Sequence, residues 1–117
     1  MKVSIIIPTH NRLEKLRETV ERLRGQDFPT EDYEIVIVDD GSNPPVTFEK
    51  DFTVSPKVMI FRLEGEERSV ARNTGAGEAT GELLIFVDDD ISTEKDFVAS
   101  HWQAHQEFSD VKAFWKI

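Results

Sequence analysis

The feature that most constrains this chain is a set of short apolar runs that do not alternate with polar residues. Four runs rich in Val and Ile occupy residues 3–7, 34–38, 58–61 and 82–87, and a fifth candidate occupies residues 111–117. Near-continuous runs of this length are typical of strands buried on both faces of a parallel sheet, whereas strands with one wet face alternate. The runs therefore predict a sheet of four to five mostly parallel strands.

The segments between these runs have helical spacing. Asn11 precedes Glu14 by three residues, as in a capping box, and an apolar stripe follows at Leu13, Leu16, Val20 and Leu23. A second helix is predicted over residues 68–79, and a third is predicted to begin after Ser92 or Thr93. The alternation of strands and helices indicates an α/β fold with helices flanking the sheet.

Length and charge narrow the class of protein. The chain has 117 residues, which indicates a single domain over residues 1–117. Its formal net charge is −9, and because non-specific nucleic-acid binding needs a basic surface, we expect no nucleic-acid partner. Cysteine is absent, which excludes disulfides and thiol catalysis and is consistent with a reducing compartment. No apolar run approaches the roughly 20 residues that span a bilayer and no signal-peptide pattern is visible, so we expect a cytoplasmic location.

Polar residues gather where the predicted strands end. The first run is followed by Pro8, Thr9, His10, Asn11 and Arg12, the second by Asp39, Asp40, Gly41 and Ser42, and the fourth by Asp88, Asp89 and Asp90. The helix before the fourth strand carries Arg68, Arg72 and Asn73. Ligands of open α/β sheets bind at the carboxyl ends of the strands. Each piece has an ordinary structural explanation by itself, such as a turn or a helix cap, but their coincidence at one edge indicates a binding site.

The three consecutive carboxylates of IFVDDDIS (residues 85–92) are the sharpest part of this set. Side chains alternate along a strand, so Asp88 and Asp90 are predicted to point the same way and Asp89 elsewhere. Two carboxylates can share a divalent cation, and Mg²⁺ takes one or two protein carboxylates together with substrate phosphates. The spacing therefore predicts a Mg²⁺ or Mn²⁺ site for a phosphorylated ligand. A P-loop is absent, and the glycines do not form a dinucleotide fingerprint.

Three motifs together resemble family-2 glycosyltransferases of the GT-A nucleotide-sugar fold. They are VSIIIPTHNR (residues 3–12), EIVIVDDGS (residues 34–42) and ARNTGAGEATGELLIFVDDD (residues 71–90), and the resemblance covers roughly residues 2–100. It implies a Rossmann-like nucleotide-binding half that binds a nucleoside-diphosphate sugar, most often UDP-linked. One departure is Asn43-Pro44-Pro45, in a loop over residues 41–56 with at most a short helical turn at 48–51, where family members often continue into a helix.

The resemblance also implies roles for individual residues. Pro8 and Thr9 would line the nucleobase pocket, Asp39 would accept a hydrogen bond from the base, and Arg72 would lie near the base and the diphosphate. In the family's DxD pair, Asp88 would reach the ribose and Asp90 would hold the metal between the two phosphates. The remaining candidates for substrate binding are Asn11, Arg12, Asp40 and Asp89, the last with no specific role implied.

The resemblance leaves the catalytic base outside the chain. The family mostly inverts the anomeric configuration with an Asp or Glu base that lies, together with the acceptor-binding half, well beyond the DxD motif. We therefore expect the base beyond residue 117, a saccharide or lipid acceptor bound by the missing region, and a full-length protein that could work at the inner face of the membrane. An excised N-terminal half is favoured over a naturally truncated homologue. His101 and His105 are interpreted as ordinary helix residues.

Two other classes stay open at this point. One is a non-catalytic module that binds a nucleotide sugar or supports assembly, with the same pocket and no turnover. The other is a Mg²⁺-binding receiver domain of signalling, which is disfavoured because no acid pair follows the first strand and no suitable lysine follows the fifth. A truncated half would also expose apolar surface near Phe108, Phe114 and Trp115, which predicts a homodimer or larger assembly.

Overall fold

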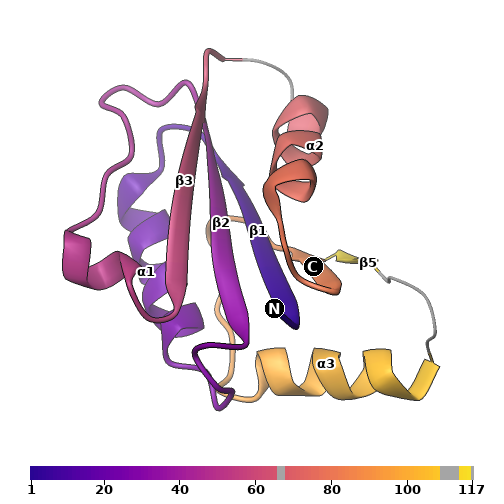
Figure 1. The fold of residues 1–117 in the computed structure, drawn as a ribbon. Coiled ribbons are helices and arrows are strands. Elements are labelled where there is room, and N and C mark those ends of the chain that lie inside the picture. Colours follow the sequence, from indigo (N-terminus) through magenta and orange to yellow (C-terminus); the bar gives the residue numbers. More distant parts are fainter. Residues whose placement is uncertain (66–67, 109–113, 117) are drawn as a thin grey trace.

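The computed structural model describes residues 1–65, 68–108 and 114–116, except for the side chains of residues 68, 108 and 114–116. Within this part of the chain, the sheet contains five parallel strands: β1 (Val3–Thr9), β2 (Tyr33–Asp40), β3 (Lys57–Leu63), β4 (Leu83–Phe86) and β5 (Phe114–Lys116). The helices are α1 (Leu13–Arg24), the 3-10 helix η1 (Lys50–Thr53), α2 (Arg68–Glu78) and α3 (Phe97–Phe108). The strand order is β3-β2-β1-β4-β5 (Figure 1). The predicted α/β class with a mostly parallel sheet and flanking helices is confirmed.

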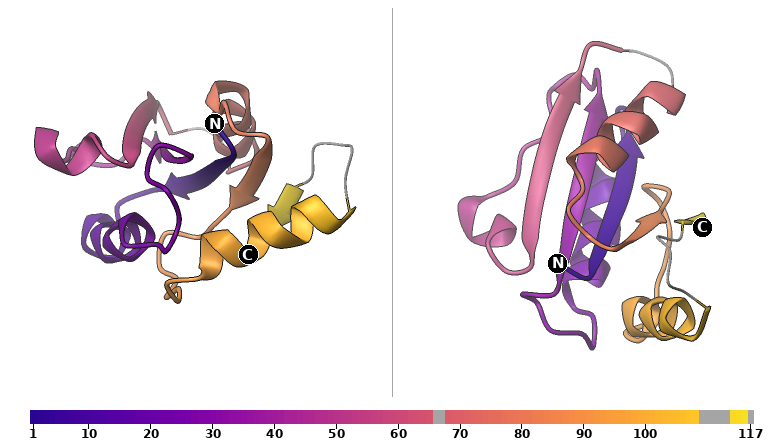
Figure 2. Two further views of the ribbon diagram at one scale, coloured as in Figure 1. Left: turned by 60° about the horizontal axis from the view of Figure 1, so that its bottom comes forward. Right: turned by 45° about the vertical axis from the view of Figure 1, so that its right-hand side comes forward.

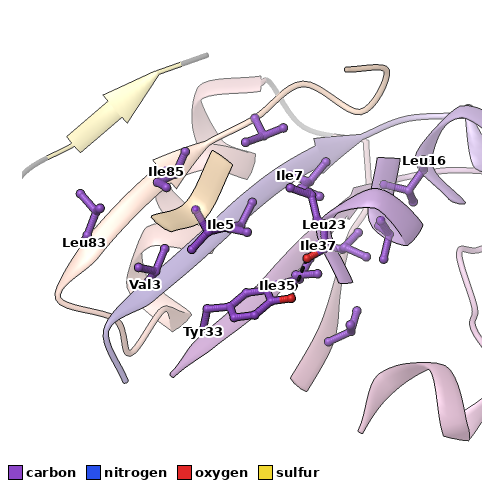
Figure 3. Close-up of a cluster of buried hydrophobic side chains, with 14 of the residues drawn as sticks. Val3, Ile5, Ile7, Leu16, Leu23, Tyr33, Ile35, Ile37, Leu83 and Ile85 are labelled. Atoms are coloured by element: carbon purple, nitrogen blue, oxygen red, sulfur yellow. Dashed lines mark hydrogen bonds between the residues drawn. The ribbon is translucent and has the colours of Figure 1, made fainter. Parts of the chain in front are cut away.

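Helices cover both faces of the sheet, as Figure 2 shows. On one face α1 and α3 pack over a large core, part of which is drawn in Figure 3 and which includes Ile5, Ile7, Leu16, Leu23, Ile35, Ile37, Ile85 and Val98. On the other face α2 lies against a smaller cluster formed by Ile6, Val36 and Leu84. Successive residues of β1 and β2 thus serve opposite cores, which explains why the runs do not alternate with polar residues.

A buried polar network fixes the entry to β4 at the far end of the sheet from the strand ends discussed below. The Ser4 hydroxyl donates to the Glu34 carboxylate over 2.6 Å, and the Thr80 N–H donates to the same oxygen over 2.8 Å. The Gly81 N–H in turn donates to the Ser4 hydroxyl over 2.8 Å. A Cβ on Gly81 would lie 2.6 Å from the Ser4 nitrogen, so only glycine allows this approach. The network therefore sets where β4 begins beside β1.

The start of α3 differs from the prediction. The helix begins at Phe97 and not directly after Ser92 or Thr93. The reason is a distant side chain: Gln26 accepts a hydrogen bond from the Val98 N–H over 2.9 Å and donates to the Glu94 carbonyl over 2.8 Å. Gln26 therefore satisfies first-turn groups that sequence reasoning assigned to a local cap.

Two expectations concern association. Among the described residues, no helix is long and apolar enough to cross a membrane. The predicted homodimer rested on Phe108, Phe114 and Trp115, whose side chains lie outside the part that the structure describes. The dimer therefore stays a prediction.

Candidate functional site

The site lies at the point where the order of strands in the sheet reverses, between β1 and β4. From β1 the chain continues to β2 and β3 on one side, then crosses through α2 to β4 on the other side of β1. The carboxyl ends of β1 and β4 therefore separate into a crevice, which is where open parallel sheets bind ligands. Figure 1 shows β2 and β3 on one side of β1 and α2 leading back across the sheet.

A small cavity of about 80 Å³ opens at this crevice. Its lining comes from the ends of three strands and from α2, and comprises Pro8, Thr9, His10, Arg12, Asp40, Ala71 and Asp89. Five of the residues predicted to bind substrate are thus brought together in one cavity. His10 and Ala71 were not among the predicted site residues, although both belong to the motifs that drew attention to the site.

The acidic loop follows β4, which ends at Phe86, so all three aspartates lie beyond the strand. Asp88 and Asp90 are exposed and Asp89 is 6% exposed, but strand alternation does not account for this because the strand has already ended. The Thr9 hydroxyl donates to the Asp89 carboxylate over 2.8 Å, and the Thr19 hydroxyl donates to the Asp89 carbonyl over 2.9 Å. Asp89, for which the sequence suggested no role, therefore ties the acidic loop to β1 and α1.

The Arg12 guanidinium places a positive charge beside the acidic loop. Its Nη2 lies 2.9 Å from an Asp90 carboxylate oxygen, and its Nη1 lies 3.6 Å from the Asp89 carboxylate. The Arg12 side chain is 44% exposed and that of Asp90 is 41% exposed, so the pair is in contact with water. Arg12 partly neutralises a loop whose carboxylates would otherwise repel one another.

Asp39 does not line the cavity. It is 1% exposed, and its carboxylate accepts hydrogen bonds from the Ser42 N–H, the Val46 N–H and the Arg62 guanidinium, each over 2.9 Å. Burial would by itself raise the pKa of Asp39, but the hydrogen bonds from Ser42 and Val46 and the charge of Arg62 outweigh it and hold the pKa below its usual value. The oxygens of Asp39 therefore hold the loop after β2, and its expected contact with a base stays a prediction.

Asp40, unlike Asp39, lines the cavity, and strand parity explains the difference. Asp39 shares the face of Ile35 and Ile37 toward α1, whereas Asp40 shares the face of Val36 toward α2, where Ala71 lies. This parity is visible in the sequence and could have distinguished the two aspartates.

Two hydrogen bonds hold the His10 side chain at the cavity. Its Nδ1 lies 2.6 Å from the Asp40 carbonyl oxygen, and because a carbonyl only accepts, Nδ1 carries the proton and donates. Its Nε2 lies 3.1 Å from the Asn11 side-chain nitrogen, which can donate to it. The imidazole orientation is therefore determined by the end of β2 on one side and by Asn11 on the other.

Asn11 is not the helix cap that the sequence suggested. Arg12 occupies the N-cap position of α1, but its side chain makes no capping hydrogen bond to the helix. Asn11 has φ of 52°, a left-handed conformation. The Asn11 N–H donates to the Ser42 hydroxyl over 2.8 Å, and its side-chain oxygen accepts from the Asn43 N–H over 2.8 Å. Asn11 thus joins the loops after β1 and β2, which gives it a positioning role outside the cavity lining.

The loop after β2 is clamped to α1 by aromatic contacts. Phe48 and Phe52 stack with centroids 4.9 Å apart, Arg17 lies 5.2 Å from the Phe48 centroid, and Arg24 lies 4.0 Å from the Phe52 centroid. The short helical turn expected at residues 48–51 occurs as η1, two residues later.

In the part of the chain that it describes, the structure does not connect the two arginines of α2 with the cavity. Arg72 is half-buried and does not line the cavity, and its Nε is buried without a hydrogen-bond partner among the described residues. The Arg68 side chain lies outside the described part. The expected contact of Arg72 with a nucleotide therefore stays a prediction.

The histidines of α3 lie apart from this cavity, as expected of helix residues. His105 is 2% exposed, and its Nε2 lies 2.9 Å from the Glu82 carboxylate. His101 lines a second, more open cavity of about 570 Å³ beside Phe97 at the start of α3. Neither histidine lines the cavity at the strand ends.

A divalent cation fits the acidic loop if a bound diphosphate supplies further oxygens to coordinate it. Among the described residues, no group of three or more His, Asp or Glu side chains is arranged to hold a metal ion. Asp88 and Asp90 are exposed carboxylates beside a cavity, and Mg²⁺ or Mn²⁺ accepts one or two such carboxylates when phosphate oxygens complete its shell. The residues therefore fit a metal shared with a diphosphate.

Comparison with known proteins decides the family. The family description "Glycosyl transferase family 2" matches residues 4–113. The chain belongs to this family. The chain is 34% identical over 126 aligned positions to the uncharacterized glycosyltransferase YfnE of Bacillus subtilis (strain 168), covering 99% of this chain and 31% of that protein. This glycosyltransferase domain thus spans about a third of the length of the relatives it matches.

Solved structures agree with the family assignment. TarS 1–349 of S. aureus superimposes with a TM-score of 0.78 at 29% identity, covering 92% of this chain and 33% of that one. The same fragment in complex with UDP-GlcNAc gives a TM-score of 0.72 at 28% identity, covering 92% and 32%. The mannosyltransferase PcManGT of Pyrobaculum calidifontis, in complex with GDP-Man and Mn²⁺, gives 0.71 at 26% identity, covering 89% and 32%. These likenesses identify the fold as the GT-A type expected from the motifs.

Proposed function

We propose that this chain is the donor-binding domain of a glycosyltransferase that transfers a sugar from a nucleoside diphosphate to an acceptor hydroxyl. The observation that carries the proposal is the cavity at the sheet's reversal point, where Thr9, Asp40 and Asp89 meet beside two exposed carboxylates. The similar structures with UDP-GlcNAc and with GDP-Man and Mn²⁺ support a nucleotide sugar as the ligand. UDP is the donor nucleotide we favour.

The base is assigned to the cavity at the ends of β1 and β2. Asp40 accepts a hydrogen bond from a ring N–H of uracil, since a carboxylate accepts and that group donates. Pro8, His10 and Ala71 provide the apolar and aromatic walls. The Thr9 hydroxyl is already committed to Asp89, so Thr9 contributes shape and loop position.

The diphosphate is assigned to the acidic loop. Asp88 lies toward the ribose and Asp90 binds a Mg²⁺ or Mn²⁺ ion together with phosphate oxygens, while Asp89 holds the loop in place from its buried position. When bound, a divalent cation acts as a Lewis acid that neutralises charge growing on the diphosphate leaving group. Arg12 adds a positive charge on the same side of the cavity.

The acceptor and the general base are assigned to regions that this chain does not include, since its relatives are about three times as long. An Asp or Glu base there would deprotonate the acceptor hydroxyl, with inversion at the anomeric carbon. A saccharide or lipid acceptor and a place at the inner face of the membrane belong to the same proposal.

Calorimetric titration of the chain with UDP, GDP and dTDP, each with and without Mn²⁺, tests the proposal. We expect UDP to bind most tightly and to need Mn²⁺, and Asp90→Asn to abolish the metal dependence. Asp51→Asn, which removes an exposed carboxylate on η1, is the matched control and should bind like the parent. Equal and metal-independent binding of all three nucleotides, or no binding at all, would contradict the proposed function.

A further inference from the structure

We propose that Arg12 is a built-in counter-cation of the acidic loop, which competes with the divalent metal for Asp90 and gives way when a diphosphate binds. This inference rests on the proposed function, because it concerns how the same site takes up its metal. We expect the nucleotide and the metal to bind cooperatively, because Arg12 pairs with the metal-binding carboxylate of Asp90 before either ligand arrives.

The contacts place Arg12 on the oxygen that a metal would need. Its Nη2 lies 2.9 Å from the Asp90 Oδ2, a distance typical of a charge-assisted hydrogen bond. Its Nη1 lies 3.6 Å from the Asp89 carboxylate, so the guanidinium bridges two of the loop's carboxylates. A cation bound to the same Asp90 oxygen would stand where the guanidinium stands.

Asp89 cannot move to relieve this competition. Its carboxylate accepts from the Thr9 hydroxyl, and its carbonyl accepts from the Thr19 hydroxyl. The turn at Asp89 and Asp90 is therefore anchored to β1 and α1, and Asp90 is presented from a fixed backbone. The element that must yield is Arg12.

Arg12 is free to do so. It precedes α1 at the N-cap, with φ of −137° and ψ of 45°, so no helical hydrogen bond depends on its side chain. Its side chain is 44% exposed and also lines the cavity. A long, half-exposed arginine can therefore turn from Asp90 toward a diphosphate at the acidic loop beside that cavity without disturbing the fold.

The energetic consequence is a coupling between two ligands. A metal that binds alone must displace Arg12 and leave the guanidinium without its carboxylate, whereas a metal that binds with a diphosphate lets Arg12 pair with phosphate oxygens. Exposed ion pairs are weak, so the competition should lower metal affinity by roughly two- to fivefold and no more. That range is measurable.

Titration of Mn²⁺ into the nucleotide-free chain, followed by the electron paramagnetic resonance signal of free Mn²⁺, tests the competition. We expect Arg12→Gln to bind Mn²⁺ roughly two- to fivefold more tightly than the parent. Arg17→Gln is the matched control: it removes the same charge from α1, where Arg17 pairs with Glu49 over 3.3 Å and does not line the cavity. Equal Mn²⁺ affinity of the two variants, or no Mn²⁺ binding in either, would overturn the inference.

The coupling is tested by repeating the titration with saturating UDP. In the parent and in Arg17→Gln, UDP should raise the Mn²⁺ affinity by a larger factor than in Arg12→Gln, because only the former two have an Arg12 to release. An equal factor in all three proteins would reject the coupling while leaving the proposed function in place. Failure of every protein to bind UDP with Mn²⁺ would instead reject the proposed function.

Discussion

Replacement of Asp39 by Asn separates a structural aspartate from a ligand-binding one. In the folded protein the Asp39 carboxylate accepts from two backbone N–H groups and from Arg62. An amide of the same shape offers one accepting oxygen, and its NH₂ group would face N–H donors that it cannot pair with. Asp39→Asn should therefore leave at least one donor buried and unpaired, in a loop whose Val46 is 6% exposed.

The magnitude follows from these contacts. An unpaired buried donor costs about 1–3 kcal/mol, and loss of the charge interaction with Arg62, whose side chain is 37% exposed, adds no more than about 1 kcal/mol after solvent screening. The free energy of unfolding should fall by about 1–4 kcal/mol. With a urea m-value of roughly 2 kcal/mol/M, the unfolding midpoint followed by circular dichroism should shift down by about 0.5–2 M.

Asp40→Asn is the matched comparison, because it makes the same chemical change one residue later. We expect it to unfold near the parent midpoint and to lose UDP affinity in calorimetry, since Asp40 lines the cavity. The reverse pattern would refute the reasoning: an unchanged midpoint for Asp39→Asn together with lost UDP binding would make Asp39 the residue that contacts the base.

Three further predictions follow from the same contacts. The folded-state pKa of Asp39 lies below the unfolded value of about 3.9. The charged carboxylate therefore stabilises the fold fully above that value, and this stabilisation is lost as pH falls through the folded pKa. In urea titrations between about pH 5 and 3, Asp39→Asn should thus lose stability less steeply than the parent protein. Thr9→Val removes the donor to Asp89 and should cost about 1–3 kcal/mol and weaken Mn²⁺-UDP binding in calorimetry, whereas Thr53→Val, which loses an exposed hydroxyl contact on η1, should change neither. Gly81→Ala brings a Cβ within 2.6 Å of the Ser4 backbone and should cost about 2–3 kcal/mol in thermal unfolding, while Gly77→Ala, whose Cβ would meet nothing within 4 Å, should be neutral or slightly stabilising.

Much of the fold could be predicted from the sequence because its strands carry a strong local signal. Runs such as residues 3–7 and 34–38 are buried on both sides by helices, and such short runs rich in Val and Ile are typical of central parallel strands. The positions of the helix starts could not be predicted equally well. The start of α3 depends on Gln26, about seventy residues away, and Asn11 donates to Ser42 and accepts from Asn43 in another loop. Caps made by distant side chains leave no mark at the local spacing.

The surroundings of individual aspartates were harder to predict. The resemblance marked the pair of acids after β2, and the parity of Ile35, Ile37 and Asp39 explains why Asp40 and not Asp39 lines the cavity. The contact of Asp89 with the Thr9 hydroxyl joins residues 80 positions apart, so no local spacing could reveal it.

The acidic loop joins these points into one physical argument. Two of the three adjacent carboxylates have different partners: buried Asp89 accepts from the Thr9 hydroxyl, and exposed Asp90 pairs with Arg12. A divalent cation with a diphosphate can replace the exposed pair of Asp90 with Arg12, whereas Asp89 is committed to the fold. The same arrangement that makes the loop stable without a ligand therefore determines which of its aspartates can respond to one.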